Sequence, residues 1–207
     1  MTTGNFDARA ATWDDDPLKV ERANAIAAAI VREVPLVAGM RALEYGCGTG
    51  LLSFALRTHF ADITMADVSD GMLAVANAKI DAAGGRDHLE AIKLDLLLEP
   101  VPGKRFDIIY SAMTLHHIPD TDAILRRFQE QLVRSGILCI ADLDTEDGTF
   151  HGAGFDGHLG FDRAELTARA LDAGFAKVRF TTAFEMNKTV NGKNQTFPVF
   201  LMVAGTA

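Results

Sequence analysis

The sequence predicts an α/β protein with a mostly parallel seven-stranded sheet, flanked by helices and ending in an antiparallel hairpin. Short apolar runs alternate with amphipathic stretches, which is the order of repeated strand–helix–strand units. The run Phe106–Tyr110 is almost continuously apolar, as is typical of a parallel strand buried on both faces. Val178–Phe184 and Phe197–Val203 are strand-like, with Asn191-Gly192 but no helix between them, so they should pair antiparallel.

The first residues are expected to form an arm that leads into a helix. Residues 1–16 are mostly polar, with Phe6 and Trp13 as isolated aromatics, and an acidic run precedes Pro17. Apolar residues recur at helical spacing across 20–34, and the acids ahead of them suit the positive end of a helix. We expect this arm either to close over the cleft as a lid or to pack permanently as an anchor.

The other elements follow from the spacing of apolar residues and from helix-ending signals. Asp162, with Glu165 three residues later, is spaced like the start of a helix, and Gly136 and Gly174 sit where helices should end. We expect strands at Ala42–Tyr45, Ile63–Ala66, Leu89–Leu94, Phe106–Tyr110 and Ile137–Ala141, and helices at Leu51–Thr58, Met72–Ala83 and Ala123–Val133.

Composition is that of an ordinary globular protein. Of the 207 residues, 48% are hydrophobic and 23% are charged, and no repeat or linker divides them, so we expect one domain over residues 1–207. A formal net charge of -8 and the lack of a Lys/Arg run argue against nucleic acid as the substrate. Two cysteines, no export signal and no run of membrane-spanning length predict a cytoplasmic protein without a membrane partner.

The glycine-rich segment 43–50 is the most informative about function. It places Gly46, Gly48 and Gly50 between a strand and a helix, where glycine lets the backbone turn tightly and lets a ligand approach the free N–H groups of the helix start. A nicotinamide dinucleotide motif would need a third glycine where Leu51 stands. With Glu44 in front, the segment resembles motif I of the class I S-adenosylmethionine-dependent methyltransferases.

This resemblance implies a Rossmann-like sheet and S-adenosylmethionine as the cofactor, with S-adenosylhomocysteine as its product. It also implies that Glu44 lies near the cationic end of the cofactor's methionine. Asp67 follows Gly46 at the spacing where a carboxylate accepts both ribose hydroxyls, although it could instead cap the next helix. Segments 66–73 and 93–96 resemble the family's ribose and adenine contacts. The implied cofactor-binding residues are Glu44, Gly46, Cys47, Gly48, Gly50, Asp67, Val68, Met72, Asp95, Leu96 and Ser111.

The fourth strand leads into segment 111–119, which resembles motif IV of the family's small-molecule branch, including ubiquinone-biosynthesis methyltransferases. The resemblance implies a small-molecule methyl acceptor, which the sequence does not identify. His116 and His117 are the candidate catalytic bases, because a histidine can take a proton near neutrality. Both could instead simply pack at a strand-to-helix turn.

The segment 141–162 follows the fifth strand and should cover the acceptor pocket. Its acids and histidines raise the alternative of a divalent ion bound by Asp142, Asp144, His151 and His158. Catechol-type methyltransferases, however, also place an aspartate after the fourth strand, where residues 111–114 offer none. We therefore expect methyl transfer without a metal and a polar substrate lid here.

Two other classes of function stay open. One is an NAD(P)-dependent oxidoreductase of Rossmann type, which Leu51 and the C-terminal hairpin disfavour. The other is a non-catalytic S-adenosylmethionine-binding partner subunit of another methyltransferase. The methylated atom and the oligomeric state are not encoded in any motif of the sequence.

Overall fold

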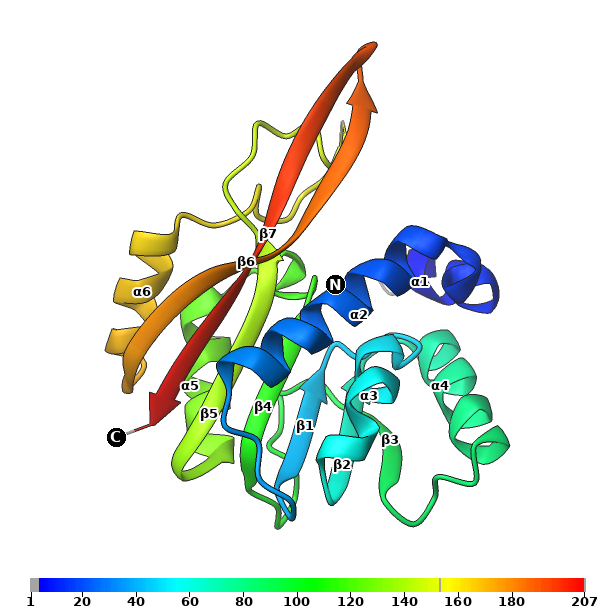
Figure 1. The fold of residues 1–207 in the computed structure, drawn as a ribbon, viewed down its shortest axis with the longest axis vertical. Coiled ribbons are helices and arrows are strands. Elements are labelled where there is room, and N and C mark those ends of the chain that lie inside the picture. The colour runs from blue at the N-terminus through cyan, green and yellow to red at the C-terminus, as the bar shows by residue number, and fades with distance from the viewer. Residues whose placement is uncertain (1–3, 153, 207) are drawn as a thin grey trace.

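The computed structural model describes residues 4–152 and 154–206, which form a seven-stranded sheet with helices on both faces (Figure 1). The order of the strands is β3-β2-β1-β4-β5-β7-β6. The first five strands are parallel, and β7 runs antiparallel to both of its neighbours. The predicted fold class is confirmed. The strands are β1 Arg41–Tyr45, β2 Asp62–Asp67, β3 Leu89–Lys93, β4 Phe106–Ala112, β5 Leu132–Leu143, β6 Phe175–Val190 and β7 Lys193–Thr206.

The sheet separates the apolar core into two layers, and helices cover the layer on each face. Ile26, Leu52 and Ile80, from three helices, belong to the core on one face. Phe128 and Leu166, from two others, belong to the core on the opposite face. The helices are α1 Gly4–Arg9, α2 Pro17–Glu33, α3 Leu51–Leu56, α4 Asp70–Ala82, α5 Thr121–Gln131 and α6 Arg163–Asp172, with short 3-10 turns at Ala10–Asp15, Arg57–His59 and Leu115–His117.

The strand order reverses between β1 and β4, and this switch point is where a ligand is expected to bind. The chain leaves β1 toward one edge of the sheet and leaves β4 toward the other. At such a switch point the loops after the two strands part and open a crevice at the carboxyl ends of the strands. The glycine turn after β1 (residues 46–50) and the histidine turn after β4 (Leu115–His117) therefore face the same crevice.

The C-terminal hairpin extends well beyond the rest of the sheet. β6 and β7 pair from Phe175 to Val190, whereas β7 pairs with β5 only between Val199 and Gly205. The remaining part of the hairpin is a two-stranded ribbon that rises above the sheet (Figure 1). The predicted antiparallel pairing and the Asn191-Gly192 turn are confirmed, and the strands are longer than expected.

One local expectation was wrong. Gly136 does not end a helix, because α5 already ends at Gln131 and β5 starts at the next residue. The extended backbone of Leu132 pairs with Phe106, so strand pairing overrides the glycine signal. The predicted arm is helical from Gly4 to Asp15. Other signals held: Asp162 caps α6 with its side chain, and Gly174 follows that helix with a φ of 96°.

Across the described ranges 4–152 and 154–206, no helix has the length and apolar character needed to cross a membrane.

Candidate functional site

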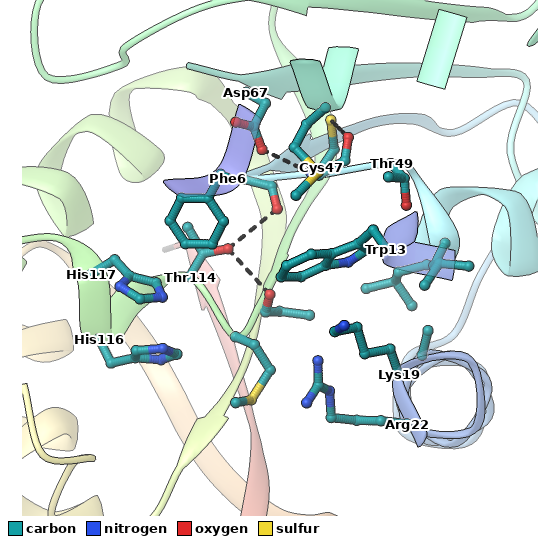
Figure 2. A pocket seen from close by; sticks show the side chains of 18 of the residues that line it. Phe6, Trp13, Lys19, Arg22, Cys47, Thr49, Asp67, Thr114, His116 and His117 are labelled. Carbon is teal, nitrogen blue, oxygen red and sulfur yellow. Dashed lines mark hydrogen bonds between the residues drawn. The ribbon is translucent and has the colours of Figure 1, made fainter. Parts of the chain in front are cut away.

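A cavity of about 690 Å³ lies at the carboxyl ends of β1 and β4. Its wall combines the N-terminal arm, α2, the glycine turn, the histidine turn, the loop after β5 and the C-terminal hairpin. Figure 2 shows Phe6 and Trp13 of the arm near Thr114 and the turn holding Cys47, with Lys19 and Arg22 reaching in from α2. Segments that are far apart in sequence thus meet around one space large enough for a cofactor and a small acceptor.

The glycine turn presents bare backbone and one buried carboxyl group to this cavity. Glu44, at the end of β1, is only 2% exposed and accepts hydrogen bonds from the backbone N–H and the hydroxyl of Ser53. The Ser53 hydroxyl also lies 2.8 Å from the Tyr110 hydroxyl. Burial raises the pKa of Glu44 to about 8, although the Ser53 bonds act to lower it. A cation placed beside Glu44 would favour its charged form.

Gly46 must be a glycine at this turn. Its φ is 72°, and a Cβ there would lie 2.3 Å from the side chain of Thr114. The Thr114 hydroxyl donates to the carbonyl oxygens of Gly46 and Ala112 at 3.2 and 3.1 Å. The close approach therefore ties the turn after β1 to the turn after β4.

Asp67 at the end of β2 holds the glycine turn from the other side. Its two carboxylate oxygens accept from the backbone N–H groups of Gly48 at 2.7 Å and Ser69 at 2.9 Å. Burial raises the pKa of Asp67, and these amides act against it. The cap of α4 is Ser69, whose hydroxyl accepts from Met72. Asp67 thus lines the cavity with its carboxylate fixed in place.

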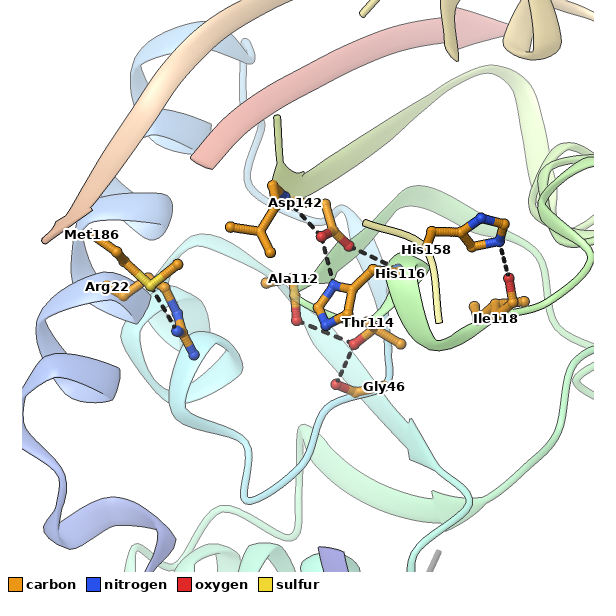
Figure 3. Close-up of polar contacts among 10 residues, drawn as sticks. Arg22, Gly46, Ala112, Thr114, His116, Ile118, Asp142, His158 and Met186 are labelled. Atoms are coloured by element: carbon orange, nitrogen blue, oxygen red, sulfur yellow. Dashed lines mark hydrogen bonds and ion pairs between the residues drawn. The ribbon is translucent and has the colours of Figure 1, made fainter. Parts of the chain in front are cut away.

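His116 and Asp142 form a buried pair beside the cavity (Figure 3). His116 Nδ1 lies 2.6 Å from Asp142 Oδ1, and the two side chains are 1% and 0% exposed. Asp142 also accepts from the backbone N–H groups of His116 and Leu143. Burial acts to raise the pKa of Asp142, but His116 and these bonds outweigh it, so the pKa lies below its usual value. The charged carboxylate assigns a hydrogen to Nδ1 of His116 and leaves Nε2 on the side of the ring away from Asp142.

His117 and His151 surround this pair as neutral rings. Burial, together with the nearby His116, lowers the pKa of each to about 4. The His151 ring stacks on Phe155 at 3.8 Å and lies 4.8 Å from the His116 ring. Within the described part of the chain, His151 Nε2 is buried without a hydrogen-bond partner. It is therefore a polar atom available to a ligand.

The loop after β5, residues 144–162, covers the histidine turn. Its His158 N–H donates to the His116 carbonyl at 2.8 Å, and the His158 ring bonds to the Ile118 carbonyl at 3.0 Å. Phe150, His151 and Phe155 from this loop line the cavity, and Ala153 lies outside the described residues. We call residues 144–162 the lid loop.

The four residues considered as metal ligands, Asp142, Asp144, His151 and His158, contact different partners. Asp142 holds His116, and Asp144 makes a two-bond ion pair with Arg163 at 2.6 and 2.7 Å. His158 bonds to the histidine turn, and His151 stacks on an aromatic ring. Within residues 4–152 and 154–206, no group of three or more such side chains converges as metal ligands would.

Arg22 and Lys188 lie in the cavity wall without a close carboxylate among the described residues. Among the described residues, neither Arg22 of α2 nor Lys188 of β6 has a carboxylate oxygen within 4.0 Å. Arg22 donates to the Met186 sulfur at 3.2 Å, and Figure 3 shows this pair across the site from His116. Burial lowers the pKa of both cations, and Arg22 lowers that of Lys188 further.

The N-terminal arm lies over the cavity, between the histidine turn and the start of α4. Phe6 packs edge-on against His117 at 5.3 Å and against Trp13 at 6.0 Å. Asp7 accepts from the Ser69 hydroxyl and from the Gly71 N–H at 2.9 Å, so the arm is fastened to the start of α4. These contacts hold the arm against the cavity, and its role as a lid or as a fixed anchor stays a prediction.

The predicted cofactor residues divide into two groups. Gly50, Asp95, Leu96 and Ser111 are not among the residues that line the cavity. The Leu96 N–H, expected to reach an adenine, donates to the Tyr45 hydroxyl, and the Ser111 hydroxyl donates to the Tyr45 carbonyl. Their ligand contacts stay predictions. Those that do line the cavity are Glu44, Gly46, Cys47, Gly48, Asp67, Val68 and Met72, together with the predicted bases His116 and His117.

The sequence interpretation missed the pairing of Asp142 with His116 and the cations Arg22 and Lys188. The His116–Asp142 pairing could have been inferred from parallel pairing of β4 with β5, because this places the residues after Ala112 beside those after Ala141. No short-range signal marks Lys188, because only the long hairpin brings it to the cavity.

Comparison with known proteins identifies what the chain is similar to. A family model described as a methyltransferase domain matches residues 42–136. The ubiquinone biosynthesis O-methyltransferase of Azorhizobium caulinodans is 30% identical over 154 residues, covering 67% of this chain and 60% of that protein. The chain thus spans less than two thirds of that relative.

Two solved structures share the fold at 18% identity. One is a Haemonchus contortus phosphoethanolamine N-methyltransferase bound to S-adenosylhomocysteine, with a TM-score of 0.72 over 87% of this chain and 52% of the other. The second is magnesium protoporphyrin IX methyltransferase from Synechocystis with S-adenosylhomocysteine, with a TM-score of 0.64 over 91% and 84%.

Proposed function

We propose that this chain is a class I S-adenosylmethionine-dependent methyltransferase that transfers a methyl group from S-adenosylmethionine to a small-molecule acceptor. One observation carries the proposal. A single cavity joins the glycine turn with Glu44 and Asp67 to the His116–Asp142 pair. The part of the cavity with the glycine turn, Glu44 and Asp67 suits a cofactor made of a nucleoside and an amino acid. The part beside the His116–Asp142 pair suits removal of a proton from a neighbouring acceptor. We further propose that residues 1–207 act as one methyltransferase domain.

The residues on the cofactor side fit the chemical groups of S-adenosylmethionine. Gly48 lines the cavity, and a Cβ there would have only the Met72 sulfur nearby, at 3.9 Å, so bare backbone faces the ligand. Asp67 offers a fixed carboxylate to the ribose hydroxyls. Glu44 offers its carboxyl to the ammonium group of the methionine part. Arg22, whose guanidinium has no carboxylate partner among the described residues, offers it to the carboxylate.

On the acceptor side, His116 is the proposed catalytic base and Asp142 the residue that positions it. When bound, S-adenosylmethionine supplies a methyl group already activated by its sulfonium. His116 Nε2 removes a proton from an acceptor hydroxyl or amine, and Asp142 stabilises the imidazolium that results. His117 and His151 stay neutral around it and shield the site from water.

Calorimetric titration with S-adenosylhomocysteine and with NADH tests the cofactor assignment. We expect one S-adenosylhomocysteine to bind per chain and NADH to give no saturable heat. Binding of NADH alone would instead favour the oxidoreductase class. The similarity to a ubiquinone biosynthesis O-methyltransferase supports a hydroxyl as the accepting group, and acceptors of that kind are the first to screen.

A further inference from the structure

The acceptor side of the cavity contains a cation that the cofactor does not need. Lys188 lies on β6, in the part of the hairpin that extends beyond β5, and its side chain lines the cavity. Its Nζ donates to the Phe150 carbonyl at 2.8 Å and sits 3.9 Å from the centre of the Phe150 ring. The other two N–H bonds of this ammonium have no acceptor among the described residues.

The acidic side chain that acts on Lys188 through its charge, Glu146, does not form an ion pair with it. Glu146 acts on Lys188 through its charge, yet no oxygen of Glu146 comes within 4.0 Å of Nζ. One carboxylate oxygen of Glu146 accepts from the Phe150 N–H at 3.0 Å, and the other is buried without a partner. The lid loop thus holds Glu146 in place and leaves the ammonium turned to the cavity.

A series of ring contacts leads from Lys188 to the proposed base. The Phe150 ring under Lys188 lies 4.7 Å from the His151 ring, which lies 4.8 Å from the His116 ring. Lys188 and His116 therefore belong to the same half of the cavity, walled by the lid loop and the hairpin. An anion bound in this half would meet the ammonium of Lys188.

We propose that the methyl acceptor carries an oxyanion, a carboxylate or a phosphate, which Lys188 binds while the accepting hydroxyl faces His116. This inference rests on the proposed function and names its class of substrate. In the reaction, the hydroxyl gives its proton to His116 Nε2, the oxygen forms a bond to the methyl carbon, and the carbon–sulfur bond breaks with its electrons left on sulfur. The oxyanion takes no part in the bond changes. It places the hydroxyl in line.

The test compares acids with matched neutral compounds on protein saturated with S-adenosylhomocysteine. The probes are 4-hydroxybenzoate against its methyl ester, lactate against lactamide, and glycerol 3-phosphate against glycerol, which separates carboxylate from phosphate. We expect at least one acid to bind about ten-fold or more tightly than its neutral counterpart, because a charged hydrogen bond is lost in the neutral compound. The variant Lys188→Met should abolish that preference, whereas Lys193→Met, on the exposed tip of the same hairpin, should keep it.

Titration of S-adenosylhomocysteine into Lys188→Met separates this inference from the proposed function. An unchanged cofactor affinity with a lost preference for acids supports the proposal. A wild-type protein that binds no acid of the panel more tightly than its neutral counterpart would overturn it, as would an equal preference in Lys188→Met. Failure of the wild-type protein to bind S-adenosylhomocysteine would contradict the proposed function itself.

Discussion

The Nδ1 atom of His116 lies 2.6 Å from the Oδ1 atom of buried Asp142, and this contact orients the ring beside the cavity. We predict that Asp142→Asn lowers the turnover number by about 100-fold or more with little change in cofactor affinity, because the ring loses the partner that fixes its tautomer. In proton–nitrogen NMR spectra, the His116 Nδ1–H signal should move or vanish in this variant. Normal turnover in the folded variant would remove Asp142 from the mechanism.

Replacing His116 should reduce turnover by more than the replacement of a residue that only packs in the core. His116→Gln should lower turnover by roughly 100- to 10,000-fold, the range for loss of a general base. His59→Gln, outside the cavity wall, is the matched control and should keep its activity. A pH–rate profile adds a second readout: His117 and His151, with pKa values of about 4, are neutral above pH 5 and should not shape it.

Asp67 provides the sharpest test of the cofactor's ribose position. Asp67→Ala should weaken S-adenosylhomocysteine binding about ten-fold or more, since hydrogen bonds to a charged acceptor contribute roughly 1.5–3 kcal/mol. Asp62→Ala, at the exposed start of the same strand, should bind as the wild type does. Because Asp67 also holds Gly48 and Ser69, a circular dichroism melt should confirm that the variant is folded. Unchanged affinity in calorimetry would disprove the ribose assignment.

Glu44 should make stability and binding depend on pH in opposite directions. Burial raises its pKa from an ordinary value of 4.5 to about 8, so between these pH values the folded chain holds a proton that the unfolded chain lacks. The free energy of unfolding should therefore fall as pH rises through this window, by up to ~1.4 kcal/mol per pH unit from this group. When the free energy of unfolding is measured by denaturant at a series of pH values, it should change less steeply with pH in Glu44→Gln than in the wild type. Equal pH dependence in the two proteins would refute the raised pKa of Glu44.

Cofactor binding should reverse that trend. The ammonium of the methionine part favours the ionised form of Glu44, so binding near neutral pH should release a proton and tighten as pH rises toward about 8. Calorimetry in buffers with different heats of ionisation measures the proton count directly. A count of zero in the wild type would mean that no cation meets Glu44.

The arm should respond to the cofactor if it is a lid. Trp13 is the single tryptophan, and the arm seats Asp7 against Gly71, where a Cβ would lie 2.8 Å from the Asp7 backbone. In the wild type, S-adenosylhomocysteine should shift or quench the emission and protect residues 4–16 from amide exchange. Gly71→Ala should displace the arm and weaken both effects. If emission and exchange are the same with and without ligand, the arm is a fixed anchor.

Most of the fold could be predicted because local patterns and tertiary structure agree. Buried parallel strands require apolar runs such as Phe106–Tyr110, and α6 begins where Asp162 offers a capping carboxylate. Gly136 was wrongly expected to end a helix, because a glycine after a helical pattern suggests a helix end. In the structure, Leu132 already pairs with β4, so the strand begins before Gly136. Glycine alone does not outweigh a row of sheet hydrogen bonds.

The site was less predictable because its key contacts are long-range. The motif around Gly46 is continuous in sequence, so its place at the cavity could be predicted. His116 and Asp142, in contrast, are joined only by the register of β4 with β5. Lys188 depends on how far a hairpin extends, which no local pattern determines.

Release of S-adenosylhomocysteine from S-adenosylmethionine, measured with a library of small-molecule acceptors, tests the central claim most directly. We predict release that requires both an acceptor and the wild-type cavity, with a matching methylated product in the mass spectrum, and a loss of about 100-fold or more in His116→Gln. A folded protein that binds S-adenosylhomocysteine yet releases none above the acceptor-free background across the library would contradict the account and point to a non-catalytic partner subunit.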